Sequence, residues 1–262
     1  MYLDGQIISS QKFPSPNPGV ELSVITYMSS SLKVKGLLAV PRRQASQEGF
    51  LYLRGGIKNI GKVRPARIAQ FAAEGFIVFA PFYRGNQGGE GNEDFAGNDR
   101  EDAFGAFKLL LNYPGIKHVH IFGFSRGGVM ALLTAIEFPE AASVVTWGGV
   151  SDMFLTYAER KDLRRMMKRV IGGTPAKYPL RYRTRTPLYR LDQLEAPVLI
   201  IHGSRDKNVS VDHAYRLENR LKELGKSVTS WYFEKYTHYF PPHINRDTVK
   251  DLCIWMKKQA EK

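Results

Sequence analysis

The chain contains very little cysteine and no long apolar run. Cys253 is the only cysteine among 262 residues, so no internal disulfide can form and a reducing compartment is permitted. No apolar stretch approaches the length of a membrane span, and the start MYLDGQIISSQKF lacks the basic and then apolar segments of a secretory signal. We therefore predict a cytoplasmic protein without a transmembrane segment, and we expect Cys253 to be buried within the apolar-periodic stretch DLCIWM.

Low-complexity blocks and internal repeats are also missing. Hydrophobic residues make up 43% of the chain and charged residues 24%, which is the balance of a globular protein and excludes a disordered one. A chain of this length can form one hydrophobic core. The prediction is a single domain over residues 1–262.

Positive charge is in excess, and it is unevenly distributed. The formal net charge is +13, and between Arg160 and Arg190 eleven lysines or arginines stand against one acid, Asp162. A basic surface attracts anionic partners through long-range electrostatics. The attraction is expected from this one segment, because most of the excess lies there.

Short apolar runs alternate with helix-period runs from about residue 50 onward. Strands are predicted at 50–56, 76–81, 117–124, 142–149, 196–203 and 227–234. Helices are predicted at 66–75, 98–112, 127–138, and near 210–224 and 246–260. This alternation predicts an α/β fold with a mostly parallel central sheet flanked by helices, and the alternating segments 21–29 and 31–40 predict antiparallel strands at one edge.

The alternation is interrupted after the sixth predicted strand. Residues 151–192 show no strand–helix pattern and are interpreted as a helical, cap-like insertion. Within it, AERKDLRRMMKRVIGG has apolar side chains at helical spacing, which predicts an amphipathic helix. Its apolar face could cover an active site or simply pack on the body of the protein with the charged face in solvent.

Six arginines of the insertion could form a positive rim. They are Arg164, Arg165, Arg169, Arg181, Arg183 and Arg185. Such a rim would attract acidic substrates, anionic lipid or a partner protein. Nucleic acid is not expected, because no recognition motif accompanies the charge.

One short motif carries the chemistry. Gly123-Phe124-Ser125-Arg126-Gly127 fits G-x-S-x-G at the point where a predicted strand ends and a predicted helix begins. In the α/β-hydrolase fold that sharp turn holds a nucleophilic serine with its hydroxyl above the sheet. We therefore predict an α/β-hydrolase fold with Ser125 as the nucleophile.

A serine nucleophile needs a histidine base and a carboxylate that orients it, and in this fold both follow the serine along the chain. Asp206 follows the strand that ends near residue 203, and Asp152, after the preceding strand, is its rival. His238 lies on the loop between the last strand and the last helix, with His243 five residues further on. Asp206 and His238 are the predicted acid and base, and this chemistry needs neither a cofactor nor a metal.

The remaining site predictions concern the oxyanion hole and the acyl pocket. Acyl transfer needs two donors aimed at the developing oxyanion. The backbone N–H of Arg126 is one by position, and the N–H of Gly56, in the Gly-Gly pair after the 50–54 strand, is the expected second. Four aromatic residues could line an acyl pocket, namely Phe154, Tyr157, Tyr239 and Phe240. Structural or solvent roles are assigned to the other strand and helix histidines, which are His118, His120, His202 and His213.

Four segments together resemble the catalytic domain of the prolyl oligopeptidase family. They are LYLRGG, PFYRGNQGGEG, FGFSRGG and PLYRLDQLEAPVLIIHGSRDKNV. The resemblance covers about residues 30–260 and implies the same triad and the same oxyanion donors. Two positions depart from the family's pattern, where Arg54 replaces a histidine before the double glycine and Thr237 replaces a glycine before the catalytic histidine.

Length is the larger departure. The family's peptidases carry a β-propeller that gates the site, and 262 residues leave no room for one, so a stand-alone hydrolase is expected. The prediction is a small-acyl carboxylesterase, because the better leaving group of an ester needs less assistance. A peptidase acting on short or N-blocked peptides is the alternative, and a non-catalytic protein that binds a polyanion or partner is a third.

Overall fold

A single large sheet organises the structure, which is a computed structural model describing residues 2–43 and 47–261. Within this part of the chain nine strands pair in the order β1-β2-β3-β5-β4-β6-β7-β8-β9. Their bounds are β1 Ile7–Phe13, β2 Val20–Ser29, β3 Leu32–Pro41, β4 Glu48–Leu53, β5 Ile77–Pro81, β6 His118–Phe124, β7 Ser143–Trp147, β8 Val198–Gly203 and β9 Val228–Phe233.

Strand direction divides the sheet into two parts. From β5 through β4 and on to β9 the neighbours are parallel, whereas β1, β2 and β3 are antiparallel to one another and β3 is antiparallel to β5. The predicted α/β fold with antiparallel edge strands is thereby confirmed. Every position of β7 and β8 is buried, as expected of parallel strands covered on both faces.

The edge strand β1 was not predicted from the sequence. Its segment IISSQKF has little apolar alternation, and six of its seven residues are exposed. Pairing with β2 along the sheet edge forms this strand, so no buried face was needed to specify it. With β1 counted, the insertion follows the seventh strand. The prediction placed it after the sixth strand and is wrong, because β1 was not among the predicted strands.

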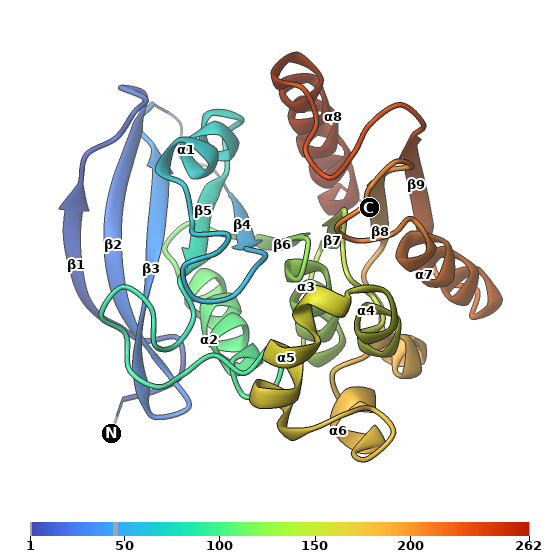
Figure 1. The fold of residues 1–262 in the computed structure, drawn as a ribbon. Coiled ribbons are helices and arrows are strands. Elements are labelled where there is room, and N and C mark those ends of the chain that lie inside the picture. Colours follow the sequence, from blue (N-terminus) through green and yellow to red (C-terminus); the bar gives the residue numbers. More distant parts are fainter. Residues whose placement is uncertain (1, 44–46, 262) are drawn as a thin grey trace.

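Helices cover both faces of the sheet (Figure 1). On one face, α1 (Pro65–Ala73) and α8 (Pro242–Ala260) pack in a cluster that includes Phe50, Phe122 and Trp147. On the other, α2 (Arg100–Leu111), α3 (Gly127–Glu137) and α7 (Asp212–Glu223) pack in a second cluster. Ten of the eleven residues of α3 are buried, so this helix is fixed firmly beneath the predicted nucleophile.

The insertion forms short helices, grouped beside α3 in Figure 1. They are α4 (Met153–Glu159), η1 (Lys161–Leu163), α5 (Arg164–Met167), η2 (Lys168–Gly172), α6 (Pro179–Arg183), η3 (Pro187–Tyr189) and η4 (Leu191–Gln193). The prediction of one regular amphipathic helix over 158–173 is wrong. The segment instead passes from a 3₁₀ turn through one α turn into a π turn. Its apolar residues nevertheless share one face, since Met167 and Ile171 are buried in the cluster that contains α3.

Cys253 is buried in α8, as predicted. Burial raises the pKa of its thiol, so the thiol stays protonated at neutral pH. Among the described residues no helix has the length and apolar character needed to cross a bilayer.

Candidate active site

Ser125 occupies the turn between β6 and α3 with a strained backbone. Its φ is +56°, a left-handed conformation that a non-glycine residue adopts only where surrounding contacts hold it. Its N–H donates to the carbonyl of Trp147 at 3.1 Å, and its carbonyl accepts from Gly128 and Val150 at 2.9 Å each. These bonds fix the turn to the neighbouring strand and to the first turn of α3.

The glycines of the motif allow this turn to form. A Cβ on Gly123 would overlap the carbonyl of Gly127, and a Cβ on Gly127 would overlap the carbonyl of Leu53. Both positions therefore exclude side chains for steric reasons. The strand–turn–helix context expected of the motif is present.

Asp206 and His238 meet at the carboxyl ends of β8 and β9. The Nδ1 atom of His238 lies 2.6 Å from Oδ2 of Asp206, and both side chains are almost fully buried. The other carboxylate oxygen of Asp206 accepts the N–H groups of Asn208 at 2.8 Å and Val209 at 3.0 Å. A carboxylate held in this way keeps one oxygen aimed at the imidazole, which fixes Nδ1 as the protonated nitrogen.

Two glycines that the sequence reasoning did not single out make room for this pair. A Cβ on Gly148, just after β7, would lie 3.0 Å from His238 Nδ1 and 3.2 Å from Asp206 Oδ2. A Cβ on Gly203 would lie 2.5 Å from the carbonyls of Tyr236 and Thr237. Side chains at these positions would keep the histidine loop away from the acid.

His202 supports the acid loop from below. Its Nε2 donates to the carbonyl of Val209 at 3.0 Å and lies 3.6 Å from Oδ2 of Asp206. Burial lowers the pKa of His202, so the ring is neutral at physiological pH. His202 therefore has a structural role, as predicted, because it holds the loop that carries Asp206.

The rival candidates lie elsewhere. Asp152 caps α4 by accepting the N–H groups of Phe154 and Leu155, and it pairs with Arg216 at 2.8 Å. His243 is exposed near the start of α8. Among the described residues, neither Asp152 nor His243 forms a hydrogen bond or ion pair with Asp206 or His238.

His238 lies beside the elbow. Its ring packs on Phe124, with centroids 4.7 Å apart, and Phe124 immediately precedes the serine. Within the described residues the Ser125 hydroxyl makes no hydrogen bond to His238. Catalytic hydrogen bonds of this kind often tighten only when a substrate is bound.

The loop after β4 passes directly over the serine. A Cβ on Gly55 would lie 2.6 Å from Ser125 Cβ and 3.2 Å from its Oγ. Gly56 has a φ of +64°, and a Cβ there would overlap the carbonyl of Ile60. Arg126 precedes α3, so its backbone N–H is not used by the helix. Both predicted oxyanion donors thus come from segments in contact with the serine.

The four aromatic residues suggested for an acyl pocket separate into three settings. Phe240 is buried against Trp147 and Phe233. Phe154 and Tyr157 are half-buried and pack on Tyr182 within the insertion. Tyr239 is 68% exposed, and its ring contacts those of Phe124 and His238. Tyr239 is therefore the aromatic residue of the four that is both exposed and next to the predicted base.

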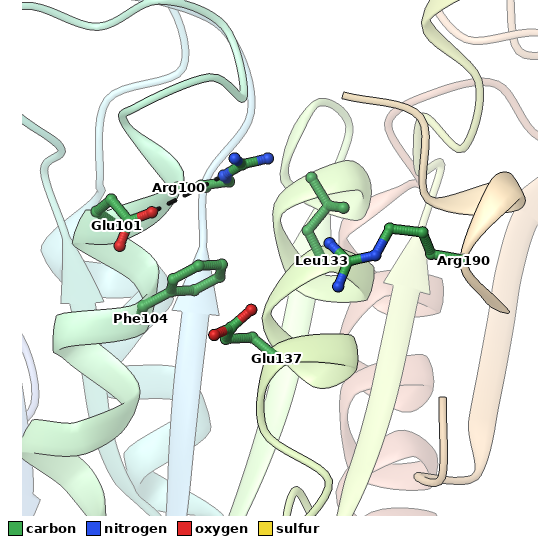
Figure 2. A pocket seen from close by; sticks show the side chains of 6 residues that line it. All are labelled: Arg100, Glu101, Phe104, Leu133, Glu137 and Arg190. Carbon is green, nitrogen blue, oxygen red and sulfur yellow. Dashed lines mark ion pairs between the residues drawn. The ribbon is translucent and has the colours of Figure 1, made fainter. Parts of the chain in front are cut away.

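The hollow in Figure 2 is lined by none of these residues. It opens between α2, α3 and the segment before η4, and its lining residues are Arg100, Glu101, Phe104, Leu133, Glu137 and Arg190. The lining is mostly polar and includes no member of the predicted triad. A second hollow between α1 and α8 likewise contains none of them.

The predicted positive rim is only partly free. Arg165, Arg169 and Arg183 are exposed, whereas Arg185 is mostly buried and pairs with Asp94 at 3.3 Å. Arg164 donates to the carbonyls of residues 157 and 158, and Arg181 to those of 171 and 172. The rim therefore presents fewer unpaired guanidinium groups than the sequence suggests.

Comparison with known proteins identifies the family of this chain. Residues 62–262 match the model of the prolyl oligopeptidase family. The chain is 61% identical over 256 residues to the protein titled "Uncharacterized peptidase YtmA" of Bacillus subtilis, covering 97% of this chain and 100% of that one. It is 30% identical over 223 residues to an acetyl-hydrolase of Streptomyces hygroscopicus, covering 76% of this chain and 69% of that protein.

A solved structure of a longer protein shares the fold. Pyrococcus horikoshii acylaminoacyl peptidase superposes with a TM-score of 0.75 at 20% identity, and the match covers 97% of this chain but 42% of that one. The chain thus spans less than half of that peptidase. From the family match and the close relative, the chain belongs to the prolyl oligopeptidase family and is a serine hydrolase of that family.

Proposed function

We propose that this chain hydrolyses small acyl esters through Ser125, His238 and Asp206 by way of an acyl-enzyme. The observation that carries the proposal is the buried contact of 2.6 Å between His238 Nδ1 and Asp206 Oδ2, beside a serine held at positive φ. A carboxylate on Nδ1 leaves Nε2 free to accept a proton. That is the arrangement required to activate a serine hydroxyl at neutral pH.

The proposed reaction has two halves. In the first, Ser125 Oγ attacks the acyl carbonyl while His238 Nε2 takes the hydroxyl proton and then passes it to the leaving alcohol. In the second, His238 removes a proton from water, which attacks the acyl-enzyme. The bond between the acyl carbon and Ser125 Oγ then breaks, and the imidazolium returns the proton to Oγ as the acid leaves. Asp206 accepts the Nδ1–H of His238 and stabilises the imidazolium formed in each half.

Stabilisation of the oxyanion is assigned to the N–H groups of Gly56 and Arg126. Preorganised donors of this kind contribute about 10²–10³-fold each in comparable enzymes. The close approach of Gly55 to Ser125 supports this assignment, because it places the glycine loop next to the atom that attacks.

Similarity to an acetyl-hydrolase at 30% identity supports an ester with a small acyl group. An ester also expels a better leaving group than an amide, so it depends less on a second site that grips the substrate. The alternative is a peptidase acting on short or N-blocked peptides. The printed names of the B. subtilis relative and of the acylaminoacyl peptidase favour that alternative.

The test compares a series of aryl esters of increasing acyl length with matched aryl amides. We expect turnover of acetyl and propionyl esters to exceed that of the amides by at least about 100-fold in kcat/KM. In Ser125→Ala we expect a loss of about 10⁴-fold or more. Ser9→Ala, an exposed serine of β1, is the matched control and should behave as the wild type.

Two results would reject the proposal. Amides turned over as well as esters would support the peptidase alternative. A fluorophosphonate probe that does not label Ser125, together with no turnover, would support a non-catalytic protein that keeps the fold.

The exposed arginines of the insertion are assigned a supporting role. We propose that they attract anionic acyl substrates or an anionic partner toward this end of the molecule. The support is the local charge, with eleven cations and one acid between Arg160 and Arg190, and the exposure of Arg165, Arg169 and Arg183.

A further inference from the structure

A carboxylate that the proposed mechanism does not use lies directly behind the elbow. Glu93 belongs to the loop between β5 and α2, and its side chain is fully buried. One of its oxygens accepts from Nη2 of Arg54 at 2.9 Å and from Nη2 of Arg126 at 2.6 Å. The other accepts the backbone N–H of Lys58 at 2.6 Å.

Both arginines are almost completely removed from solvent. Their side chains are 3% and 2% exposed, and each guanidinium lies 5.0 Å from the centroid of the Tyr83 ring, which both contact. A second carboxylate, Asp99, accepts from Nη1 of Arg126 at 2.8 Å. Burial of so many charges is costly and is tolerated only where geometry and pairing are good.

The charges are retained in spite of burial. Burial by itself raises the pKa of Glu93, but the charges of Arg126 and Arg54 outweigh it and hold that pKa below its usual value. Burial alone would lower the pKa of Arg126, and Asp99 and Glu93 raise it instead. Glu93 therefore acts as a fixed anion between two fixed cations.

The two arginines are adjacent in the sequence to the residues of the proposed oxyanion hole and to the serine. Arg54 immediately precedes Gly55 and Gly56, whose loop touches the serine, and Arg126 immediately follows Ser125. Lys58 lies two residues beyond Gly56 on the same loop. The Glu93 carboxylate is thus bonded to both segments that carry the proposed oxyanion donors. On the glycine loop it bonds Arg54 before the glycine pair and Lys58 after it, and at the elbow it bonds Arg126.

The 82–99 loop is itself held in an unusual conformation. Tyr83, Phe95 and Ala96 have φ values of +64°, +62° and +66°, which non-glycine residues rarely adopt. Strained backbone of this kind persists where the surroundings fix it, and it is common near functional sites. Arg54 bonds the same loop twice, because its Nη2 donates to Glu93 at 2.9 Å and to the carbonyl of Phe82 at 3.0 Å.

We propose that Glu93 is a positioning residue which sets the separation of the two oxyanion donors by bonding Arg54 and Lys58 on one side and Arg126 on the other. The inference rests on the proposed serine-hydrolase function and extends it to the residue that preorganises its oxyanion hole. Donors of an oxyanion hole act only at about 2.7–3.1 Å from the oxyanion, so a small displacement removes much of their effect.

The test is Glu93→Gln, which keeps the size of the side chain and removes its charge. We expect kcat for an aryl ester, per fluorophosphonate-titratable Ser125, to fall about 10–100-fold, with KM changed by less than about twofold. The rate of fluorophosphonate labelling should fall in parallel, because that reaction also places an oxygen in the hole. Glu90→Gln, in the same loop but bonded to the backbone of Lys33, is the matched control and should keep the wild-type kcat.

A purely structural role for Glu93 predicts a different pattern. It would lower the melting temperature and the fraction of titratable sites while leaving kcat and the labelling rate per site at the wild-type values, and that result overturns the proposal. If Glu93→Gln does not fold, Arg54→Lys decides, since it keeps the charge but loses the branched guanidinium. We expect a 3–10-fold loss in kcat per site there, and an unchanged kcat rejects the proposal.

Failure of the proposed function can be distinguished from failure of the inference about Glu93. Wild-type protein that Ser125-directed fluorophosphonate does not label would overturn both the serine-hydrolase function and the inference built on it. Wild-type protein that is labelled, alongside a Glu93→Gln variant labelled equally fast, would overturn the inference alone.

Discussion

Arginine is used in opposite ways at the elbow and in the insertion. Arg54 and Arg126 are buried, hydrogen-bonded to carboxylates and stacked on an aromatic ring. Arg165 and Arg169 are exposed on short helices and make no ion pair among the described residues. The large positive charge of the sequence is thus of two kinds. Buried guanidinium groups are paired with carboxylates, and exposed ones contribute to the electrostatic field outside the protein.

The largest expected effect comes from removing a buried arginine. Arg126→Met leaves Glu93 and Asp99 buried without their main partner, so we expect the free energy of unfolding to fall by about 3–5 kcal/mol. Arg169→Met, at an exposed site of the insertion, should change it by less than about 0.5 kcal/mol. Urea denaturation of both variants measures the difference, and equal losses would remove the distinction between the two regions.

The pH dependence of stability tests the buried cluster through Asp99. Burial, together with Asp94 and Glu93, raises the pKa of Asp99 from 3.8 to about 6, although Arg126 opposes the rise. Between these values the folded protein holds a proton that the unfolded chain has lost, so stability falls as pH rises from about 4 to about 6 and is flat above. At 1.36 kcal/mol per pKa unit this amounts to about 3 kcal/mol.

Asp99→Asn should lack this component. Urea denaturation at intervals between pH 4 and 7 should show a shallower decline with pH in the variant than in the wild type. Parallel pH profiles would show that Asp99 does not titrate in that range.

A smaller effect is expected where the two regions meet. Arg185 of the insertion pairs with Asp94, one residue after Glu93, at 3.3 Å. We expect Arg185→Gln to cost about 1 kcal/mol. A double-mutant cycle with Asp94→Asn should give a coupling energy of about 0.5–2 kcal/mol. Strictly additive losses would mean that the pair does not link the insertion to this loop.

The smallest effect concerns the exposed charges. Replacing Arg165, Arg169 and Arg183 together by Gln should leave stability within about 0.5 kcal/mol. For an anionic ester at low ionic strength kcat/KM should fall about 2–10-fold, and the difference should vanish near 0.5 M salt because screening removes long-range attraction. A neutral ester serves as the control, and an anionic ester that shows no salt dependence would argue against steering.

Local patterns were sufficient for most of the fold. The strands β4 to β9 and the helices α1, α2, α3, α7 and α8 lie close to the predicted ranges, because buried parallel strands and the helices that cover them have distinct apolar periods. The patterns failed for β1, which has no buried face, and for 158–173, where the apolar spacing is helical but the backbone changes from 3₁₀ to π geometry. In both cases contacts with distant segments decided the local conformation.

The candidate site shows the same division. Ser125, Asp206 and His238 were nominated from a motif and from chain order, and the structure brings the latter two to 2.6 Å. Gly148 and Gly203 could not be nominated in this way, since their importance lies in atoms of other loops that approach them. Glu93 was also missed, because one acid among several in NQGGEGNEDFAG has no local feature that marks it.

Local sequence patterns specified the order of the elements, the candidate nucleophile at the strand–helix turn, and the candidate acid and base. These depend on periodicity and on spacing over a few residues, which the chain carries directly. Only the tertiary structure decided which charges are buried and with what partners. Glu93 is 39 positions from Arg54 and 33 from Arg126 along the chain, and it meets both through a loop in which several non-glycine residues have positive φ angles.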